Sequence, residues 1–527
     1  MLLGLSLIGC RDLGSGWSVD TLFPMVDSRL DLVDIMTDSL VHTNSDNQLM
    51  LVYEGKIIDF SMDDFKIPDT TVLQNHPGPG VTLNWPKRVP LISDTSDNSF
   101  DVPNVDLVRT TIKSGKMEVK ITSSIREDIE ITYIMPGATK GGVPLSITRV
   151  LPGSPSLSNP TIRTETIDLS GYTVDLRGKN RRGYNTMIYY FTAEFVDKLN
   201  PDSIYQYGST DYMNIENSFV KVIPEDGHGV FHTQTLSEDS ISDETSGLFK
   251  NVLSGSIDLE QVKLDLSFKN YIGADFQGVI HKLASINSET GNRVDLKSDY
   301  IGKSININRA LLLNNGSYPP IRASYYTIGL DEKNSNIDKL IENFPDQFAY
   351  HVDFVVNPDG NVSGGNDFIY TDYGIEGLLN IEMPLSLIAN NLKLFDTTDF
   401  DPGEGDEGLK DVIGGYLHVY CDNWYPFDAE IQLKLLDKDN GELIDLFLPE
   451  SNIKAGIVDE NGVVTAPTRT KISAPANQQR MDQFYRAEKA IVYLTFNTEG
   501  EEHKKVYASY YCNLKVIADL QYNLEIK

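Results

Sequence analysis

An internal repeat constrains the fold of this chain more than any other feature of its sequence. Three ungapped stretches begin at Met117, Leu264 and Leu417: MEVKITSSIREDIEITY, LDLSFKNYIGADFQGVI and LHVYCDNWYPFDAEIQL. Their starting points lie 147 and 153 residues apart. Apolar and polar residues alternate at matching positions, which is the period of a half-buried β-strand. A unit of about 150 residues is too long for a solenoid repeat and has the size of a domain.

A polar corner interrupts each stretch at the same place. A small polar residue ends the first apolar run and an aspartate follows five residues later; these are Ser123, Asn270 and Asn423, then Asp128, Asp275 and Asp428. Such side chains bond to nearby backbone, so the pattern predicts a strand, a tight corner and a second strand. We therefore predict a mainly β protein, with tandem β-sandwich (Ig-like) domains behind a short N-terminal lipidated region.

The repeat also gives the expected domain boundaries. They are a signal segment at 1–9, an N-terminal lipid-anchored region at 10–95, and β-sandwich repeats at 96–245, 246–400 and 401–527. Polar stretches that have the composition of boundaries or loops occur at 93–99, 237–245 and 399–408. Helical signals are few, and they predict two short helices, at Ser28–Asp38 and Asn336–Phe344.

The apolar N-terminal run LLGLSLIGC ends abruptly at Cys10. It is too short to span a bilayer, which takes about 20 apolar residues. The tetrad LIGC has the form of a bacterial lipobox, in which the cysteine thiol receives a diacylglycerol and the peptide is cut just before it. A buried first strand is the alternative. We favour lipidation of Cys10, which would anchor a body that lies in an aqueous compartment.

The chain is strongly acidic, with 45 Lys and Arg residues against 76 Asp and Glu residues and a net charge of −31. This charge argues against nucleic acid and against an anionic lipid surface as the main partner. One stretch, RGKNRRG at 177–183, has four cations in seven residues. It is either a solvated hairpin tip or a contact to phosphate-bearing lipid headgroups or to an acidic partner.

No catalytic constellation stands out, because the sequence has no G-x-S-x-G elbow, phosphate loop, dinucleotide fingerprint or C-x-x-C motif. We predict a non-enzymatic protein without catalytic residues or a cofactor. His228 and His232 have the four-residue spacing of a helical zinc pair, but their flanking glycines favour a surface loop. Asp359, Asn361 and Asp367 are weak calcium candidates in an oxygen-rich loop, where plain β-turns are the favoured alternative.

Two cysteines remain beside Cys10, and both lie in alternating apolar runs. Buried thiols are the default expectation for Cys421 and Cys512, and a single disulfide is the alternative.

The lipobox, the segment GWSVDTLFPMVDSRLDLVDIMTDSL that follows it, and the β-repeat together resemble large outer-membrane lipoproteins of Bacteroidota. The resemblance implies a lipid-anchored protein of the outer membrane, on the cell surface. It implies a place as an accessory subunit of an outer-membrane β-barrel complex. It also implies O-glycosylation at Asp-Ser/Thr-apolar sites, for which the matches are Thr21, Ser39, Ser203 and Ser240.

Three functions fit these features. The first is a non-enzymatic, lipid-anchored scaffold that contacts an outer-membrane β-barrel machine for insertion, secretion or uptake. The second is a glycan-binding or adhesive surface lipoprotein. The third is a periplasmic lipid-carrying β protein, which would need an apolar lumen that side chains leave unfilled. Nucleic acid is not an expected partner for any of the three.

Overall fold

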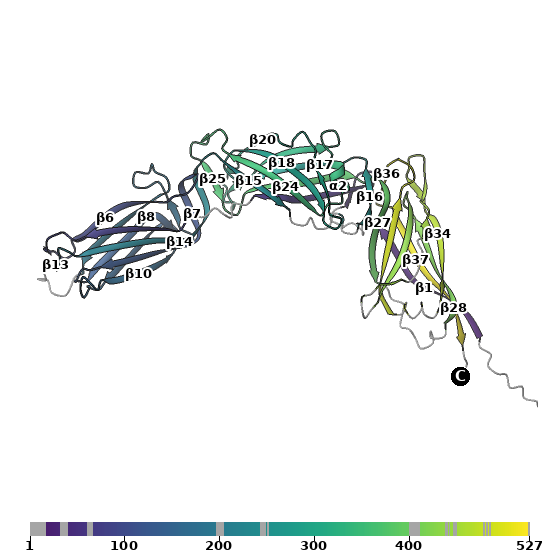
Figure 1. Cartoon of the computed structure of the whole chain (residues 1–527), viewed down its shortest axis with the longest axis horizontal. Helices are drawn as coiled ribbons and strands as arrows, with labels where there is room; N and C mark the ends of the chain where they lie inside the picture. The colour runs from purple at the N-terminus through teal and green to yellow at the C-terminus, as the bar shows by residue number, and fades with distance from the viewer. Residues whose placement is uncertain are drawn as a thin grey trace, which may run out of the picture.

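A computed structural model shows three lobes that follow one another in a curved row (Figure 1). The structure describes residues 17–31, 41–60, 67–196, 205–242, 249, 252–399, 412–437, 441, 443–445, 451–477, 480, 483 and 486–524. Most of these residues lie in antiparallel strands, which confirms the prediction of a mainly β protein. We name the lobes module one (67–231), module two (41–60 and 232–384, without β16) and module three (17–31, β16 and 386–524).

Module one is a sandwich of two four-stranded sheets that one short strand connects. One sheet has the order β4 (Thr70–Pro77), β14 (Tyr212–Phe231), β7 (Val105–Ser123) and β10 (Thr161–Asp168). The other has the order β6 (Pro90–Ser99), β12 (Thr186–Phe195), β8 (Ile129–Lys140) and β9 (Val143–Leu151). The short strand β11 (Thr173–Asp175) pairs with both β7 and β8 and so joins the two sheets.

Modules two and three repeat this arrangement. One sheet of module two has the order β3 (Leu49–Phe60), β26 (Ile375–Pro384), β17 (Lys263–Asn270) and β23 (Ser324–Asp331). The facing sheet has the order β15 (Gln234–Ile241), β24 (Gln347–Val356), β18 (Phe276–Asn287) and β20 (Ser304–Ile307). One sheet of module three has the order β1 (Trp17–Asp31), β37 (Tyr511–Leu524), β28 (Val412–Asn423) and β34 (Thr468–Ala476). The facing sheet has the order β27 (Ser386–Asp399), β35 (Ala487–Asn497), β29 (Asp428–Asp437) and β31 (Ser451–Ile453).

The strand order is the same in all three modules. When the eight main strands of a module are numbered along the chain, the sheets run 1-8-3-6 and 2-7-4-5. This is the connectivity of a jelly roll, whereas an immunoglobulin domain has seven strands or nine in another order. The β-sandwich prediction is therefore confirmed, and its Ig-like refinement is wrong. Short strand runs with frequent turns are common to both folds, so the sequence pattern did not separate them.

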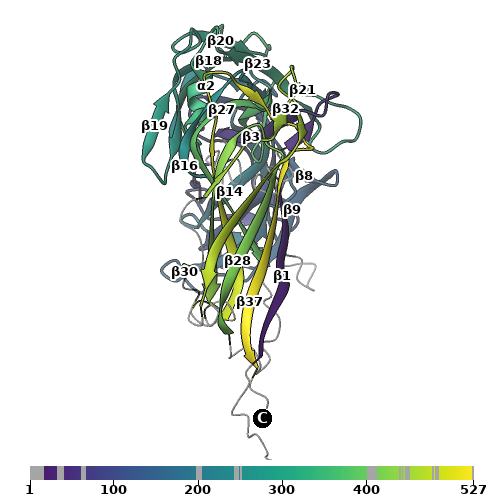
Figure 2. The same cartoon turned by 90° about the vertical axis from the view of Figure 1, so that its right-hand side faces the viewer.

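The modules are nested in one another along the chain. Strands β1, β3 and β4 come first and serve as strand 1 of modules three, two and one, in that order. The other seven strands of each module follow, from module one to module three. Residues 10–95 therefore do not form a separate N-terminal region where the structure describes them, because their strands complete all three sandwiches. As a consequence of this nesting, the first strand that the structure describes, β1, lies beside the last, β37, along module three (Figure 2).

The remaining elements extend or connect these sandwiches. β16 (Val252–Leu259) leaves module two to pair with β27, and β2 (Val41–Thr43) extends β3. The small strands are β5 (Leu83–Trp85), β13 (Tyr205–Tyr207), β19 (Asn292–Asp295), β21 (Leu311–Leu312), β22 (Ile321–Arg322), β25 (Asp367–Tyr370), β30 (Leu443–Asp445), β32 (Ile457–Val458), β33 (Val464–Ala466) and β36 (Lys504–Lys505).

One of the two predicted helices is present. Helix α2 (Ile337–Glu342) lies inside the predicted range Asn336–Phe344 and buries Ile337, Leu340 and Ile341. The helix predicted at Ser28–Asp38 is wrong as far as Asp31, since that part belongs to β1, and 32–38 lie outside the described residues. Pairing with β37 overrides the local helical pattern of this segment.

Two of the polar stretches that were expected to be boundaries or loops are strands. Residues 93–99 lie in β6 and 237–241 lie in β15, and each of these strands has a single neighbour at the edge of its sheet. Polar and charged side chains suit an edge strand, because they discourage pairing with another chain. The polar composition of these two edge strands is therefore similar to that of a loop, and this similarity explains the wrong prediction.

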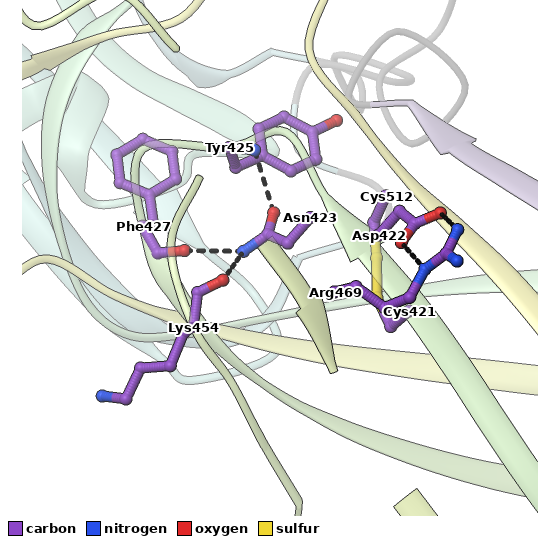
Figure 3. Close-up of a disulfide and its surroundings, with 8 residues drawn as sticks. All are labelled: Cys421, Asp422, Asn423, Tyr425, Phe427, Lys454, Arg469 and Cys512. Atoms are coloured by element: carbon purple, nitrogen blue, oxygen red, sulfur yellow. Dashed lines mark hydrogen bonds and ion pairs between the residues drawn. A yellow bond between two sulfur atoms is a disulfide. The ribbon is translucent and has the colours of Figure 1, made fainter. Parts of the chain in front are cut away.

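The repeated corner has the predicted form in all three modules. Oδ1 of Asn423 accepts a hydrogen bond from the Tyr425 N–H, and its Nδ2 donates to the carbonyls of Phe427 and Lys454 (Figure 3). Asn270 makes the matching contacts in module two, and Ser123 accepts from the backbone two residues ahead in module one.

The repeated aspartates cap a later segment of their own module and not the corner itself, so the expectation that they bond to nearby backbone is wrong. Oδ1 of Asp128 accepts from the Gly153 N–H, Asp275 from Arg309 and Asp428 from Ala455, at distances of 2.9, 3.1 and 2.8 Å. Each aspartate stands at the start of the second strand of the repeated pair. It thereby fixes the segment that follows the next strand of the module, which is β9, β20 or β31.

Cys421 and Cys512 form a disulfide, so the default expectation of two buried thiols is wrong. The two cysteines lie on neighbouring strands β28 and β37, where Cys421 pairs with Leu514 and Asn423 with Cys512. Their sequence positions are 91 residues apart, so only the strand order of the jelly roll brings them together. The disulfide lies beside the Asn423 corner (Figure 3).

Candidate functional site

A basic groove lies at the junction of modules one and two. It encloses about 820 Å³ and is lined from module one by the cations Arg109, Arg177, Lys179 and Arg181. Module two closes it with Leu312 and the segment 365–367. A volume of this size is within the usual range for small-molecule and oligosaccharide sites. The groove is therefore a concentration of positive charge in a chain whose net charge is −31.

The loop between β11 and β12 carries three of these cations, and its own backbone closes it. The Gly183 N–H donates to the carbonyl of Arg177, and the Arg181 N–H donates to the carbonyl of Gly178. Gly178 and Arg181 have φ values of +66° and +52°, the left-handed region that a tight loop requires. The RGKNRRG motif is thus a defined loop on the wall of the groove.

The cations of this loop differ in how they are held. Arg177 binds Asp175 through two hydrogen bonds, of 2.9 and 2.6 Å. The Arg177 guanidinium holds the pKa of Asp175 below its ordinary value. Lys179 and Arg181 are exposed and form no salt bridge with any residue that the structure describes. These two side chains can therefore reach a ligand without breaking an internal ion pair.

A histidine supports the fourth cation of the groove. Nη2 of Arg109 lies 2.6 Å from Nε2 of His228, on the neighbouring strands β7 and β14. Burial lowers the pKa of His228 to about 4, with a further lowering from the charge of Arg109. At neutral pH the imidazole is therefore uncharged and accepts the hydrogen bond from Arg109, and a carboxylate oxygen of Asp226 lies 3.8 Å from the same imidazole nitrogen.

His228 and His232 do not form the metal pair that was weighed as an alternative. His228 lies in strand β14 and His232 lies just after its last residue, and in extended backbone a spacing of four residues separates Cα atoms by about 13 Å. Nε2 of His232 lies 3.1 Å from a carboxylate oxygen of Asp106, while His228 contacts Arg109. The glycines that disfavoured a helix lie within β14, so the favoured surface loop is wrong for His228, whereas His232 is exposed in the short connection between β14 and β15.

A buried polar network fixes the two walls of the groove. Strand β25 of module two pairs with the end of β14, so one sheet continues across the junction. The side chain of Asp367 is fully buried and accepts hydrogen bonds from the Phe231 N–H, the Asn357 amide and the Arg309 guanidinium. Because paired groups of this kind are costly to separate, the junction is held in one arrangement.

This network includes one of the three calcium candidates, Asp367. Asp367 has three internal donors and serves the junction, so its oxygens are already engaged. Asn361 accepts from the Gly365 N–H and the Ser363 hydroxyl within its own turn, and Asp359 is exposed. The favoured alternative of β-turns describes this loop well, and a calcium site there stays an unsupported prediction.

The modification sites lie mostly where the structure gives no detail. Cys10, Ser39 and Ser203 lie outside the described residues, and Thr21 lies in strand β1. Ser240 is described: it lies in edge strand β15 and its hydroxyl donates to Glu238. Lipidation of Cys10 and glycosylation of the four hydroxyl sites therefore stay predictions.

The arrangement of the groove suits the binding of an anion. Guanidinium and ammonium groups bind phosphate or carboxylate oxygens by charge-assisted hydrogen bonds. Thr139, Thr173 and the exposed ring of Tyr190 also line the groove. Two carboxylates, Asp175 and Asp367, belong to the lining as well, and each is paired with an arginine. Sequence reasoning found the loop cations but missed Arg109, and it considered His228 only as a partner of His232, since Arg109 and His228 are 119 residues apart in the chain.

Comparison with known proteins gives little further constraint. No protein-family model and no curated protein matches the chain. A solved structure from Parabacteroides distasonis, described as a "putative secreted protein", matches with 16% sequence identity and a TM-score of 0.28. The match covers 56% of this chain and 88% of that one. Among the residues that the structure describes, no helix is long and apolar enough to cross a membrane.

Proposed function

We propose that this chain is an exported, lipid-anchored recognition scaffold of the outer membrane, which binds an anionic group of its partner in the basic groove. The observation that carries this proposal is the groove itself, where Lys179 and Arg181 are exposed and lack a salt bridge to a described residue. Fixed positive charge inside an acidic molecule attracts anions to one place and repels them elsewhere.

The disulfide supports the export part of the proposal. Disulfides such as Cys421–Cys512 persist in oxidising compartments and are rare in the bacterial cytosol. Lipidation of Cys10 would place module three next to the membrane, because the seven residues to Trp17 span at most about 25 Å. Module one and the groove would then stand farther from the membrane along the row of modules (Figure 1).

The partner that fits this geometry is an acidic surface of an outer-membrane β-barrel complex, contacted at the junction of modules one and two. The chain acts in this proposal by recognition and not by catalysis. Rigid modules in series hold a binding site at a fixed distance from an anchor, which is the physical requirement for a scaffold.

Tyr190 favours a second candidate, the binding of an acidic glycan. Its side chain is 40% exposed and lines the groove beside the cations. Sugar rings stack on exposed aromatic faces, while carboxylate or phosphate substituents would pair with Lys179 and Arg181. The lipid carrier has less support, because the apolar cavity in module one holds only about 30 Å³, the space of one water molecule.

The test is a binding experiment on the purified full chain with a series of phosphorylated, sulfated, carboxylated and neutral glycans. We expect binding to the anionic members, and we expect the double variant Lys179→Gln/Arg181→Gln to lose it. The matched control is Lys333→Gln/Lys489→Gln, which removes the same charge from exposed lysines of modules two and three. Binding should also weaken with salt, because exposed charges are screened.

Two outcomes would contradict the proposal. One is equal binding by the groove variant and the control variant. The other is saturable binding of neutral glycans alone. Labelling with an alkyne fatty acid tests the anchor separately, since Cys10→Ala should abolish it.

A further inference from the structure

Two histidines and one aspartate converge on the outer face of module two. Nε2 of His281 lies 2.7 Å from Oδ2 of Asp353, and Nε2 of His351 lies 3.8 Å from Oδ1 of the same carboxylate. The two imidazole rings lie 4.7 Å apart between centroids. The donor atoms of the three residues all lie within 4.8 Å of one another, and no other group of this kind occurs among the described residues.

A β-bulge brings these side chains together. His281 lies on β18 and His351 on β24, and the register between the two strands shifts between Ile280 and Lys282. The extra residue at the bulge is His281. Bulges are known to redirect a side chain toward a functional position. Here the shift places the imidazole of His281 beside Asp353, which stands two residues from His351 on the same face.

The carboxylate at the centre is incompletely satisfied. Oδ1 of Asp353 is buried and has no hydrogen-bond partner in the structure. Buried carboxylate oxygens without a partner are rare and call for an explanation. A cation bound to this oxygen would explain why it has no hydrogen-bond donor.

We propose that His281, His351 and Asp353 form a binding site for a divalent transition-metal ion, with zinc as the best match. Imidazole and carboxylate ligands are the donor set that Zn²⁺ takes in proteins, at about 2.0–2.2 Å. Small rotations of the three side chains bring their donor atoms to one ion. Three protein ligands leave a coordination position for water or for a fourth group.

The neighbouring edge strand offers a fourth ligand. Asp239 of β15 lies opposite His351 in the strand register, and its side chain is exposed. Ser237 of the same strand has its hydroxyl 3.4 Å from Nε2 of His351. A metal ion here would link β18, β24 and β15 across the sheet and thus stabilise module two.

The experiment is calorimetric titration of the purified full chain with ZnCl₂ after treatment with a chelator. We expect one equivalent of Zn²⁺ per chain, and an affinity at least about tenfold lower in His281→Ala and in His351→Ala. His232→Ala is the matched control, because His232 pairs with Asp106 in module one without a second histidine. Its affinity should equal that of the unchanged protein.

Two further readouts separate metal binding from a folding defect. The chelated His281→Ala and His351→Ala proteins should melt close to the unchanged protein. Zn²⁺ should raise the melting temperature of the unchanged protein and of the His232→Ala control, but not that of these two variants. Co²⁺ should give a visible absorption band that the same two variants lose. The proposal is overturned if the unchanged protein shows no saturable Zn²⁺ binding, or if both variants bind as tightly as the control.

Discussion

The repeated corner gives a quantitative prediction for Asn423→Ala. The Asn423 side chain is 1% exposed and makes three hydrogen bonds to backbone, of 2.9, 2.9 and 3.0 Å (Figure 3). Alanine would leave the Tyr425 N–H and two carbonyls without these partners. Each bond contributes about 1 kcal/mol, so module three should lose about 3 kcal/mol. For a domain of about 150 residues this lowers the melting temperature by roughly 6–12 °C.

The other two modules supply internal standards for the same substitution. Asn270→Ala removes bonds of 2.8 and 2.9 Å and a longer one of 3.3 Å, so module two should lose nearly as much. Ser123 accepts a single bond, of 3.2 Å, so Ser123→Ala should cost module one about 1 kcal/mol. Asn423→Asp keeps the acceptor but turns an oxygen toward two carbonyls, and it should destabilise at least as much as alanine.

Hydrogen-exchange mass spectrometry measures these effects, because its peptides report on each module separately, and calorimetry gives the melting temperatures. We expect faster exchange in the substituted module alone. The reasoning is refuted if Asn423→Ala costs no more than Ser123→Ala, or if all three modules lose protection equally.

Three other predictions follow from the fold. Cys421→Ser/Cys512→Ser should destabilise module three by about 2–4 kcal/mol, the usual contribution of a disulfide that closes a long loop, while modules one and two keep their denaturation midpoints. A fragment of 386–527 lacks β1 and β16 and should aggregate through the open edges of β37 and β27, and peptides of 17–31 and 252–259 together should restore a sharp melting transition, whereas 67–231 should fold alone. The pKa of His228 in the folded protein, about 4, lies below its ordinary value of 6.5, so the histidine's contribution to stability is complete above pH 6.5 and is lost as the pH falls toward 4. The denaturation midpoint of His228→Gln should therefore depend less on pH between 6.5 and 4 than that of the unchanged protein.

Local signals in the sequence predicted local structure well. The period-two alternation located the paired strands of the repeat, and the Ser and Asn positions gave the corners. Helix α2 was also predicted, since it is short and carries its own apolar face. These features depend on residues that are close in the chain.

Long-range pairing was beyond such signals. β1 pairs with β37, with Trp17 opposite Leu524, and no local pattern carries that information. The strand order decided both the jelly-roll connectivity and the disulfide. The edge strands β6 and β15 were misread for a related reason: most of their residues are polar, and only the pairing with a neighbouring strand shows that they are strands.

The candidate sites show the same division. The loop cations of the groove were visible as a run in the sequence, and the structure added Arg109 and its contact with His228 on the neighbouring strand. His281 and Asp353 lie 72 residues apart and meet only through the pairing of β18 with β24. A scan for closely spaced ligands therefore could not find them.

Site-specific photo-crosslinking in intact cells tests the central claim, that the groove is where this chain meets its partner. A photoreactive phenylalanine analogue would replace Tyr190 in the groove or Tyr416, a more exposed tyrosine of module three. We expect a discrete adduct from position 190, which disappears in the Lys179→Gln/Arg181→Gln background and persists with Lys333→Gln/Lys489→Gln. An adduct from position 416 alone, or a position-190 adduct that survives loss of the groove cations, would contradict the account.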